Sequence, residues 1–85
     1  MADIVIYTKT YCPYSKNAKD FFDKMNVKYD EKVIDNDPAL TMEMVTKSGE
    51  RTDTPQIFIN NHHIGSFDDV KALKETGKLY EMLNK

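Results

Sequence analysis

Near the N-terminus, the pattern of apolar and polar residues predicts a strand followed by a helix. The run Ile4–Tyr7 is short, continuously apolar and rich in β-branched residues, which is typical of a strand buried on both faces. After polar residues 8–11, apolar side chains recur with helical spacing at Ala18, Phe21, Phe22 and Met25. Pro13 suits the first helical position, where a missing N–H costs nothing, so Cys12 is expected at or near the N-cap.

The next segments predict a second strand and a second helix. Val27–Ile34 has the composition of a strand, and strand–helix–strand over about 30 residues is a βαβ unit with parallel strands. The turn Asp35–Pro38 is expected to cap a helix from Pro38 to about Lys47. Leu40, Met44 and Val45 are expected to face inward, and Gly49 is expected to end this helix.

The C-terminal half predicts a hairpin and two short helices. Gln56–Ile59 and the strand His62–Ile64, which ends at Gly65, flank Asn60-Asn61, a two-residue turn that tolerates positive φ. A helix is expected to begin at Asp68 or Asp69 and to bury Val70 and Leu73, and a last helix to carry Leu79, Tyr80 and Leu83. The order β-α-β-α-β-β-α-α predicts an α/β fold, in which helices cover one mixed sheet.

Composition narrows the class of protein. The chain has 85 residues, enough for one small domain over residues 1–85, and its 40% hydrophobic and 31% charged content is typical of a globular protein. A net charge of −2 argues against a nucleic-acid partner. No apolar run approaches the roughly 18 residues of a transmembrane helix, and residues 1–8 do not resemble a signal peptide. The single cysteine excludes an intrachain disulfide. The expected location is a reducing compartment, the cytoplasm or an organelle matrix after loss of a transit peptide.

The position of Cys12 favours a reactive thiol. The thiolate is the nucleophilic form, and unpaired N–H groups and the dipole at a helix start stabilise it. Lys9 and Lys16 could add positive charge nearby. The alternative is a buried structural cysteine, although the flanking Thr, Tyr, Pro and Tyr residues do not form a core run.

Ser15 lies three residues after Cys12, where a redox motif would carry a second cysteine. Its hydroxyl can donate a hydrogen bond toward the sulfur or cap the helix, but it cannot form a disulfide. A dithiol site resolves a mixed disulfide internally. With Ser15 the mixed disulfide on Cys12 requires an external thiol, and glutathione is the abundant candidate.

Four segments in order resemble the glutaredoxin family over nearly the whole chain. They are IVIYTK followed by CPYS (4–9 and 12–15), DTPQIF (53–58), NHHIG (61–65) and GSFDD (65–69). They are similar to the family's Cys-Pro-Tyr-Cys site, its Thr-Val-Pro segment, the end of its fourth strand and its Gly-Gly-x-Asp-Asp segment. The resemblance implies a thioredoxin-like fold with a four-stranded mixed sheet in the order 2-1-3-4.

The resemblance also implies a glutathione site. Cys12 would take glutathione as a mixed disulfide, beside a groove bordered by Tyr14. The Thr54 backbone would pair with the cysteine of glutathione, and a cis Pro55 would hold Thr54 there. Lys9, with Arg51 or Gln56, would approach the glycine carboxylate. The γ-glutamyl end would meet the segment Gly65, Ser66, Phe67 and Asp68, where backbone N–H groups suit its carboxylate and Asp68 its ammonium.

Three further positions depart from the family pattern. Asp53 replaces a threonine and puts a negative charge near the groove for an anionic tripeptide, and Thr54 replaces the usual valine. Ser66 replaces the second glycine. The branch of the family that binds iron–sulfur clusters carries Cys-Gly-Phe-Ser, whereas this chain has Pro13 and Tyr14. The serine at position 15 has two possible origins: the protein is a natural monothiol member of the family, or it is a dithiol protein in which the second cysteine was changed to serine.

Three functions follow as hypotheses. The first is a monomeric, glutathione-dependent oxidoreductase acting on glutathionylated or disulfide-containing proteins. The second is an iron–sulfur carrier bridged by Cys12 of two chains and two glutathiones, and the third is a structural domain with an ordinary thiol. No resident metal is expected, since His62 and His63 are neighbours on a strand and point to opposite faces. Without the resemblance, Asp68 and Asp69 are explained as N-cap residues and Lys9 as a solvated side chain.

Overall fold

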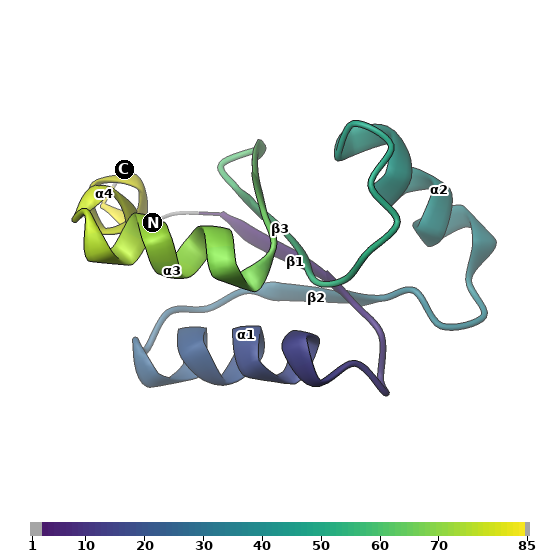
Figure 1. The fold of residues 1–85 in the computed structure, drawn as a ribbon, viewed down its shortest axis with the longest axis horizontal. Helices are drawn as coiled ribbons and strands as arrows, with labels where there is room; N and C mark the ends of the chain where they lie inside the picture. Colours follow the sequence, from purple (N-terminus) through teal and green to yellow (C-terminus); the bar gives the residue numbers. More distant parts are fainter. Residues whose placement is uncertain (1–2, 85) are drawn as a thin grey trace.

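The computed structural model describes residues 3–84 and has one four-stranded sheet with helices on both faces (Figure 1). The elements in chain order are β1 Ile4–Thr8, α1 Pro13–Lys24, β2 Asp30–Val33, α2 Pro38–Lys47, β3 Gln56–Ile59, β4 His62–Gly65, α3 Phe67–Glu75 and α4 Lys78–Leu83. The sheet order is β2-β1-β3-β4, with β2 parallel to β1 and the other two pairs antiparallel. This confirms the predicted order of elements and the 2-1-3-4 sheet.

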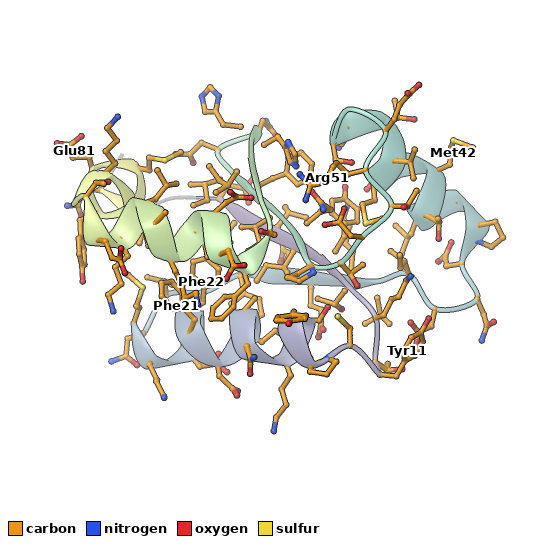
Figure 2. The ribbon with its side chains drawn as sticks, viewed as in Figure 1. Tyr11, Phe21, Phe22, Met42, Arg51 and Glu81 are labelled. Atoms are coloured by element: carbon orange, nitrogen blue, oxygen red, sulfur yellow. The ribbon has the colours of Figure 1, made fainter. Side chains whose placement is uncertain are left out.

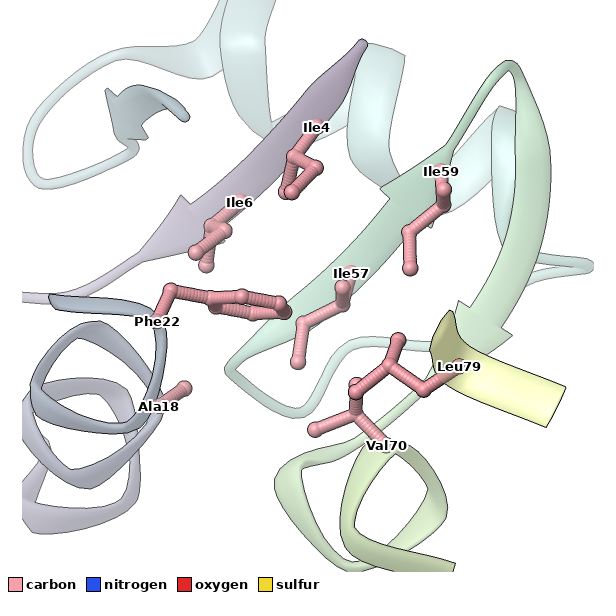
Figure 3. Packing of buried hydrophobic residues seen from close by; sticks show 8 residues of the cluster. All are labelled: Ile4, Ile6, Ala18, Phe22, Ile57, Ile59, Val70 and Leu79. Carbon is pink, nitrogen blue, oxygen red and sulfur yellow. The ribbon is translucent and has the colours of Figure 1, made fainter. Parts of the chain in front are cut away.

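Side chains of β1 and β3 alternate between two cores, because successive residues of a strand point to opposite faces. On one face, Ile4 and Ile6 of β1 pack with Ile57 and Ile59 of β3 against α1, α3 and α4. Figure 3 shows these side chains converging with Phe22 and Val70 from the helices. This core fixes the start of α1, which carries Cys12, relative to β3.

The second core lies under α2. Tyr7 and Phe58 point to this face and pack with Ile34 and Met44, with ring centroids of Tyr7 and Phe58 5.6 Å apart. Leu40 and Val45 pack against the same cluster, as the helical spacing predicts. In Figure 1, α2 lies at the opposite end of the molecule from α4, with the sheet between them.

Turn and cap residues set the element boundaries. Asp37 caps α2 by accepting a hydrogen bond from the Leu40 backbone N–H at 3.0 Å, as predicted. Asn60 and Asn61 both have positive φ, 51° and 66°, in the turn between β3 and β4. The sequence therefore specified these turns through residue types that suit them.

Two boundaries differ from the prediction. The strand predicted over Val27–Ile34 is shorter: its pairing with β1 begins at Asp30, opposite Val5, and in this register residues 27 and 28 lie before the first residue of β1. The helix predicted to begin at Asp68 or Asp69 begins at Phe67, with Ser66 as its N-cap. Asp69 instead accepts a hydrogen bond from the Ser66 backbone N–H at 2.9 Å, as the third residue of a capping box does. None of the described helices has the length and apolar character needed to cross a membrane.

Candidate active site

Cys12 is the N-cap residue of α1, in extended conformation, with Pro13 in the first turn. Its backbone N–H donates to the Lys9 carbonyl oxygen at 3.2 Å, which closes a tight turn between β1 and α1. The backbone N–H and hydroxyl of Thr10 both donate to Asp35, which follows β2. The segment that carries the half-buried thiol is therefore held from two directions.

The environment of the Cys12 sulfur favours the thiolate. Partial burial raises the pKa of the Cys12 thiol, but hydrogen bonds with the side chains of Thr54 and Ser15 and with the backbone N–H groups of Ser15 and Tyr14 lower it below its ordinary value. The backbone N–H groups belong to the first turn of α1, where they have no partner within the helix. The pKa of Cys12 is thus lowered by a hydrogen bond with Thr54 and by hydrogen bonds at the helix start, and the charges of Lys9 and Lys16 are not among the causes.

Ser15 is buried, with 1% of its surface exposed. Its hydroxyl oxygen accepts a hydrogen bond from the Lys9 backbone N–H at 3.4 Å. The hydroxyl therefore contacts both the loop before Cys12 and the sulfur itself. Contact with the sulfur was one of the two roles that the sequence left open for this hydroxyl, and contact with the loop was not predicted.

A groove of about 300 Å³ adjoins the thiol. Its lining consists of Tyr14, Arg51, Asp53, Thr54, Pro55, Ser66, Phe67 and Asp68. The thiol of Cys12 lies 3.5 Å from the Thr54 carbonyl oxygen, so the sulfur lies next to the lining of the groove. A larger hollow of about 460 Å³, lined in part by Asp23 and Tyr29, contains no thiol.

Arg51 and Asp53 form a bidentate ion pair at this groove. The Arg51 Nε lies 2.8 Å from Asp53 Oδ1, and an Arg51 Nη lies 2.7 Å from Asp53 Oδ2. The hydrogen bonds with Arg51 hold the pKa of the Asp53 carboxyl below its ordinary value, and those with Asp53 raise the pKa of the guanidinium. Figure 2 shows Arg51 on the connection between α2 and β3, separate from Tyr11 at the turn that enters α1.

The segment from Thr54 to Gln56 joins the groove to the sheet. The Thr54–Pro55 peptide bond is cis, as the resemblance implies. Gln56 is fully buried, and its amide donates to the Asp53 carbonyl oxygen at 2.9 Å while its Oε1 lies 2.7 Å from His63 Nε2. Gln56 therefore supports the backbone of the groove from beneath.

The start of α3 forms the other end of the groove. Gly65 has φ of +117°, and a Cβ at this position would overlap the Asp69 carboxylate. Asp69 accepts hydrogen bonds from both the backbone N–H and the hydroxyl of Ser66, at 2.9 and 3.0 Å. Phe67 packs edge-on against Phe21 of α1. These contacts hold the first turn of α3 next to α1.

The structure brings most of the predicted site residues together. Tyr14, Arg51, Asp53, Thr54, Pro55, Ser66, Phe67 and Asp68 line the groove, with Cys12 beside it. Lys9, Ser15, Gln56 and Gly65 lie outside the lining, Ser15 and Gln56 as buried hydrogen-bonding groups. The role of Asp35 in anchoring Thr10 was not predicted, because an acidic residue after a strand carries no signal of a distant partner. In the described part of the chain, residues 3–84, no group of three or more His, Cys, Asp or Glu side chains could hold a metal ion.

Comparison with known protein families matches residues 4–64 to the family described as Glutaredoxin. The chain belongs to the glutaredoxin family. Glutaredoxin 3 of Escherichia coli strain K12 is 45% identical over 83 residues, covering 98% of this chain and 99% of that protein. The glutaredoxin of Pseudomonas aeruginosa is 39% identical over 84 residues, with 99% of each chain covered.

Solved glutaredoxin structures share the fold. The crystal structure of the buckwheat glutaredoxin–glutathione complex has a TM-score of 0.85 at 31% identity and covers 95% of this chain and 76% of that chain. The solution structure of glutaredoxin from Brucella melitensis has a TM-score of 0.83 at 40% identity, with 98% and 89% covered. This glutaredoxin therefore has the thioredoxin-like fold that the four segments implied, with a serine at the fourth position of its Cys-Pro-Tyr-Ser site.

Proposed function

We propose that this glutaredoxin is a glutathione-dependent thiol–disulfide oxidoreductase that works through the single thiol of Cys12. The observation that carries the proposal is the position of that thiol. Hydrogen bonds with Thr54 and at the start of α1 lower the pKa of this thiol, which lies 3.5 Å from the Thr54 carbonyl oxygen at the edge of a groove. A reactive sulfur beside a groove suited to a short peptide is what this chemistry requires.

The proposed reaction is an exchange of disulfide bonds. The Cys12 thiolate attacks the glutathione sulfur of a glutathionylated protein, the Cys12–glutathione bond forms, and the protein sulfur leaves as a thiolate that takes up a proton. A second glutathione, as its thiolate, then attacks the glutathione sulfur bound to Cys12, which releases the Cys12 thiolate and oxidised glutathione. Across the two steps, one glutathione thiol is oxidised and the protein sulfur is reduced, because the first glutathione sulfur is already in a disulfide. Ser15 cannot replace the second glutathione, because a hydroxyl forms no disulfide.

The groove supports a direction for the bound tripeptide. Its γ-glutamyl end would lie at Ser66, Phe67 and Asp68, where the first N–H groups of α3 suit a carboxylate and Asp68 suits an ammonium. The Thr54 backbone would pair with the central cysteine, and Tyr14 would form one wall. The glycine carboxylate would approach Arg51, with Lys9 nearby. Gln56 would act indirectly, because its buried amide holds the Asp53 carbonyl oxygen. The choice of ligand is supported by the similar glutaredoxin from buckwheat, which was solved as a complex with glutathione.

The proposed partners follow from this chemistry. They are glutathione and glutathionylated or disulfide-containing proteins, acted on by a monomer in a reducing compartment such as the cytoplasm. The free thiol at the site supports this choice, since such compartments keep thiols reduced.

Intact mass after incubation with oxidised glutathione tests the proposal. We expect one glutathione to be added to the chain, and we expect Cys12→Ser to gain none. Added reduced glutathione should remove the adduct, and the protein should release glutathione from a glutathionylated peptide. Absence of both the adduct and this release would overturn the proposal.

The iron–sulfur carrier stays a prediction. One chain offers a single thiol, so a cluster would need Cys12 of two chains and two glutathiones. Anaerobic reconstitution with iron, sulfide and glutathione, followed by a visible absorption spectrum, tests it. A colourless monomer would count against the carrier.

A further inference from the structure

The charged side chains that line the groove have an excess of negative charge. Arg51 contributes a positive charge to the lining, whereas Asp53 and Asp68 contribute negative charges. Glutathione at neutral pH carries one more carboxylate than it has ammonium groups. The proposed position of its γ-glutamyl ammonium at Asp68 leaves Arg51 as the lining residue that can receive the terminal carboxylate. The state of the Arg51 guanidinium therefore decides how that carboxylate is bound.

Asp53 already accepts hydrogen bonds from two nitrogens of the Arg51 guanidinium. Both Asp53 oxygens accept from Arg51, at 2.8 and 2.7 Å, in the planar two-bond geometry in which arginine binds a carboxylate. A second carboxylate must share the remaining N–H groups and approach the negative charge of Asp53. The two side chains are about half exposed, at 42% and 53%, so solvent screens this repulsion and its effect is moderate.

We infer that Asp53 is a specificity-determining residue: its ion pair with Arg51 weakens binding of a free terminal carboxylate and favours γ-glutamyl thiols in which this carboxylate is masked as an amide or ester. The inference rests on the proposed function, since it takes glutathione as the parent ligand. We expect the fold to tolerate removal of the Asp53 charge, because Gln56 binds the Asp53 backbone carbonyl and not its side chain.

The test compares two disulfides that differ only in the terminal carboxylate: oxidised glutathione and the disulfide of glutathione glycine ethyl ester. Rates of mixed-disulfide formation on Cys12 are measured by mass spectrometry. Each rate is divided by the rate at which the same disulfide reacts with a small free thiol, which corrects for the intrinsic reactivity of that disulfide. For the wild-type chain we expect the ester disulfide to react about three- to fivefold faster, the range that a partly exposed charge interaction gives.

Variants assign this preference to one side chain. We expect Asp53→Asn to raise the rate with oxidised glutathione about three- to fivefold and to leave the ester rate unchanged. Glu50→Gln is the matched control, because it removes the same charge from an exposed residue of the same connection that does not line the groove. Arg51→Gln should cancel the gain in the Asp53→Asn background, and alone it should lower the rate with oxidised glutathione, because it leaves the Asp53 charge unpaired.

The outcomes separate the inference from the proposed function. Equal ratios of the two rates in wild type, Asp53→Asn and Glu50→Gln would overturn the inference and leave the glutathione reaction standing. A gain with Asp53→Asn that is the same for both disulfides would also overturn it, since it would not depend on the terminal carboxylate. A wild-type thiol that alkylates normally but reacts with neither disulfide would overturn both.

Discussion

The Ser15 hydroxyl accepts a hydrogen bond from the Lys9 backbone N–H at 3.4 Å and so ties the first turn of α1 to the loop that precedes Cys12. This hydroxyl is buried and also hydrogen-bonds the sulfur. Ser15 is thus a structural part of the site, in addition to occupying the place of a resolving cysteine. The two roles can be tested by different substitutions.

Ser15→Ala removes the hydroxyl and keeps the backbone N–H groups that stabilise the thiolate. We expect the pKa of Cys12 to rise, because one hydrogen bond to the thiolate is lost, and alkylation near neutral pH to slow about two- to tenfold, as loss of about 0.5–1.5 kcal/mol predicts. The measurement is the rate of iodoacetamide labelling as a function of pH. Thr76→Ala is the control, since its hydroxyl bonds the Leu73 carbonyl oxygen far from the thiol. An unchanged profile for Ser15→Ala would show that the hydroxyl does not stabilise the thiolate.

Ser15→Cys restores a second thiol one turn from Cys12. We expect this variant to resolve the glutathione adduct internally and to reduce protein disulfides that the Ser15 form leaves oxidised. Mass spectrometry after treatment with oxidised glutathione distinguishes the outcomes. The wild type should carry one glutathione, and the variant should carry none while losing the mass of two hydrogens. A stable glutathione adduct on the variant would contradict this prediction.

Glu43 connects β1, β2 and α2 through its carboxylate. Hydrogen bonds from Lys32, at 2.8 Å, and from the Tyr7 hydroxyl lower the pKa of Glu43. Because the pKa is lower in the folded state than the ordinary value of about 4.3, this contribution to stability is complete above that pH and is lost as the pH falls through the folded-state pKa. We expect Glu43→Gln to lose about 1 kcal/mol at pH 7 and to show a weaker fall in stability between pH 5 and 3.

Urea unfolding at several pH values measures this effect. Glu50→Gln, at an exposed residue, is the control that should keep the wild-type pH dependence. A Glu43→Gln protein whose stability falls with acid as steeply as that of the wild type would contradict the assignment.

Gly65 joins β4 to the capped start of α3 in a conformation that disfavours a side chain. We expect Gly65→Ala to cost about 1–3 kcal/mol, since it combines an unfavourable φ of +117° with overlap of the Asp69 carboxylate. Gly49→Ala is the matched control: Gly49 also has a positive φ, +70°, but a Cβ there meets nothing within 4 Å. The measurement is the urea midpoint at constant m-value. Equal losses for the two variants would show that φ alone, without the contact to Asp69, sets the cost.

The sequence was sufficient for the order of elements and the position of the thiol, because both depend on local patterns. The apolar run at Ile4–Tyr7, the helical spacing after Pro13 and the Asn60-Asn61 turn each predict one conformation. The length of β2, the strand after α1, was overestimated, because the pairing with β1 sets how far this strand extends. Val27 is apolar, but β1 begins too late to pair with it.

Side-chain partners could not be predicted in the same way. Arg51 could have pointed into solvent, toward a ligand or toward Asp53, and only the path of the chain between α2 and β3 decides this. Gln56 looked like a ligand-binding residue, although its amide is used by the Asp53 carbonyl and His63. In both cases several partners satisfy the same polar group, and tertiary geometry selects one.

The groove is assembled from three parts of the chain that lie far apart in sequence, Tyr14, residues 51–55 and residues 66–68. No one of these segments forms the groove alone, so it exists only while β3, α1 and α3 are packed together. A tripeptide that touches all three therefore binds the native state and not the unfolded chain. Its presence shifts the unfolding equilibrium by mass action, and the melting temperature of this small protein becomes a measure of ligand concentration.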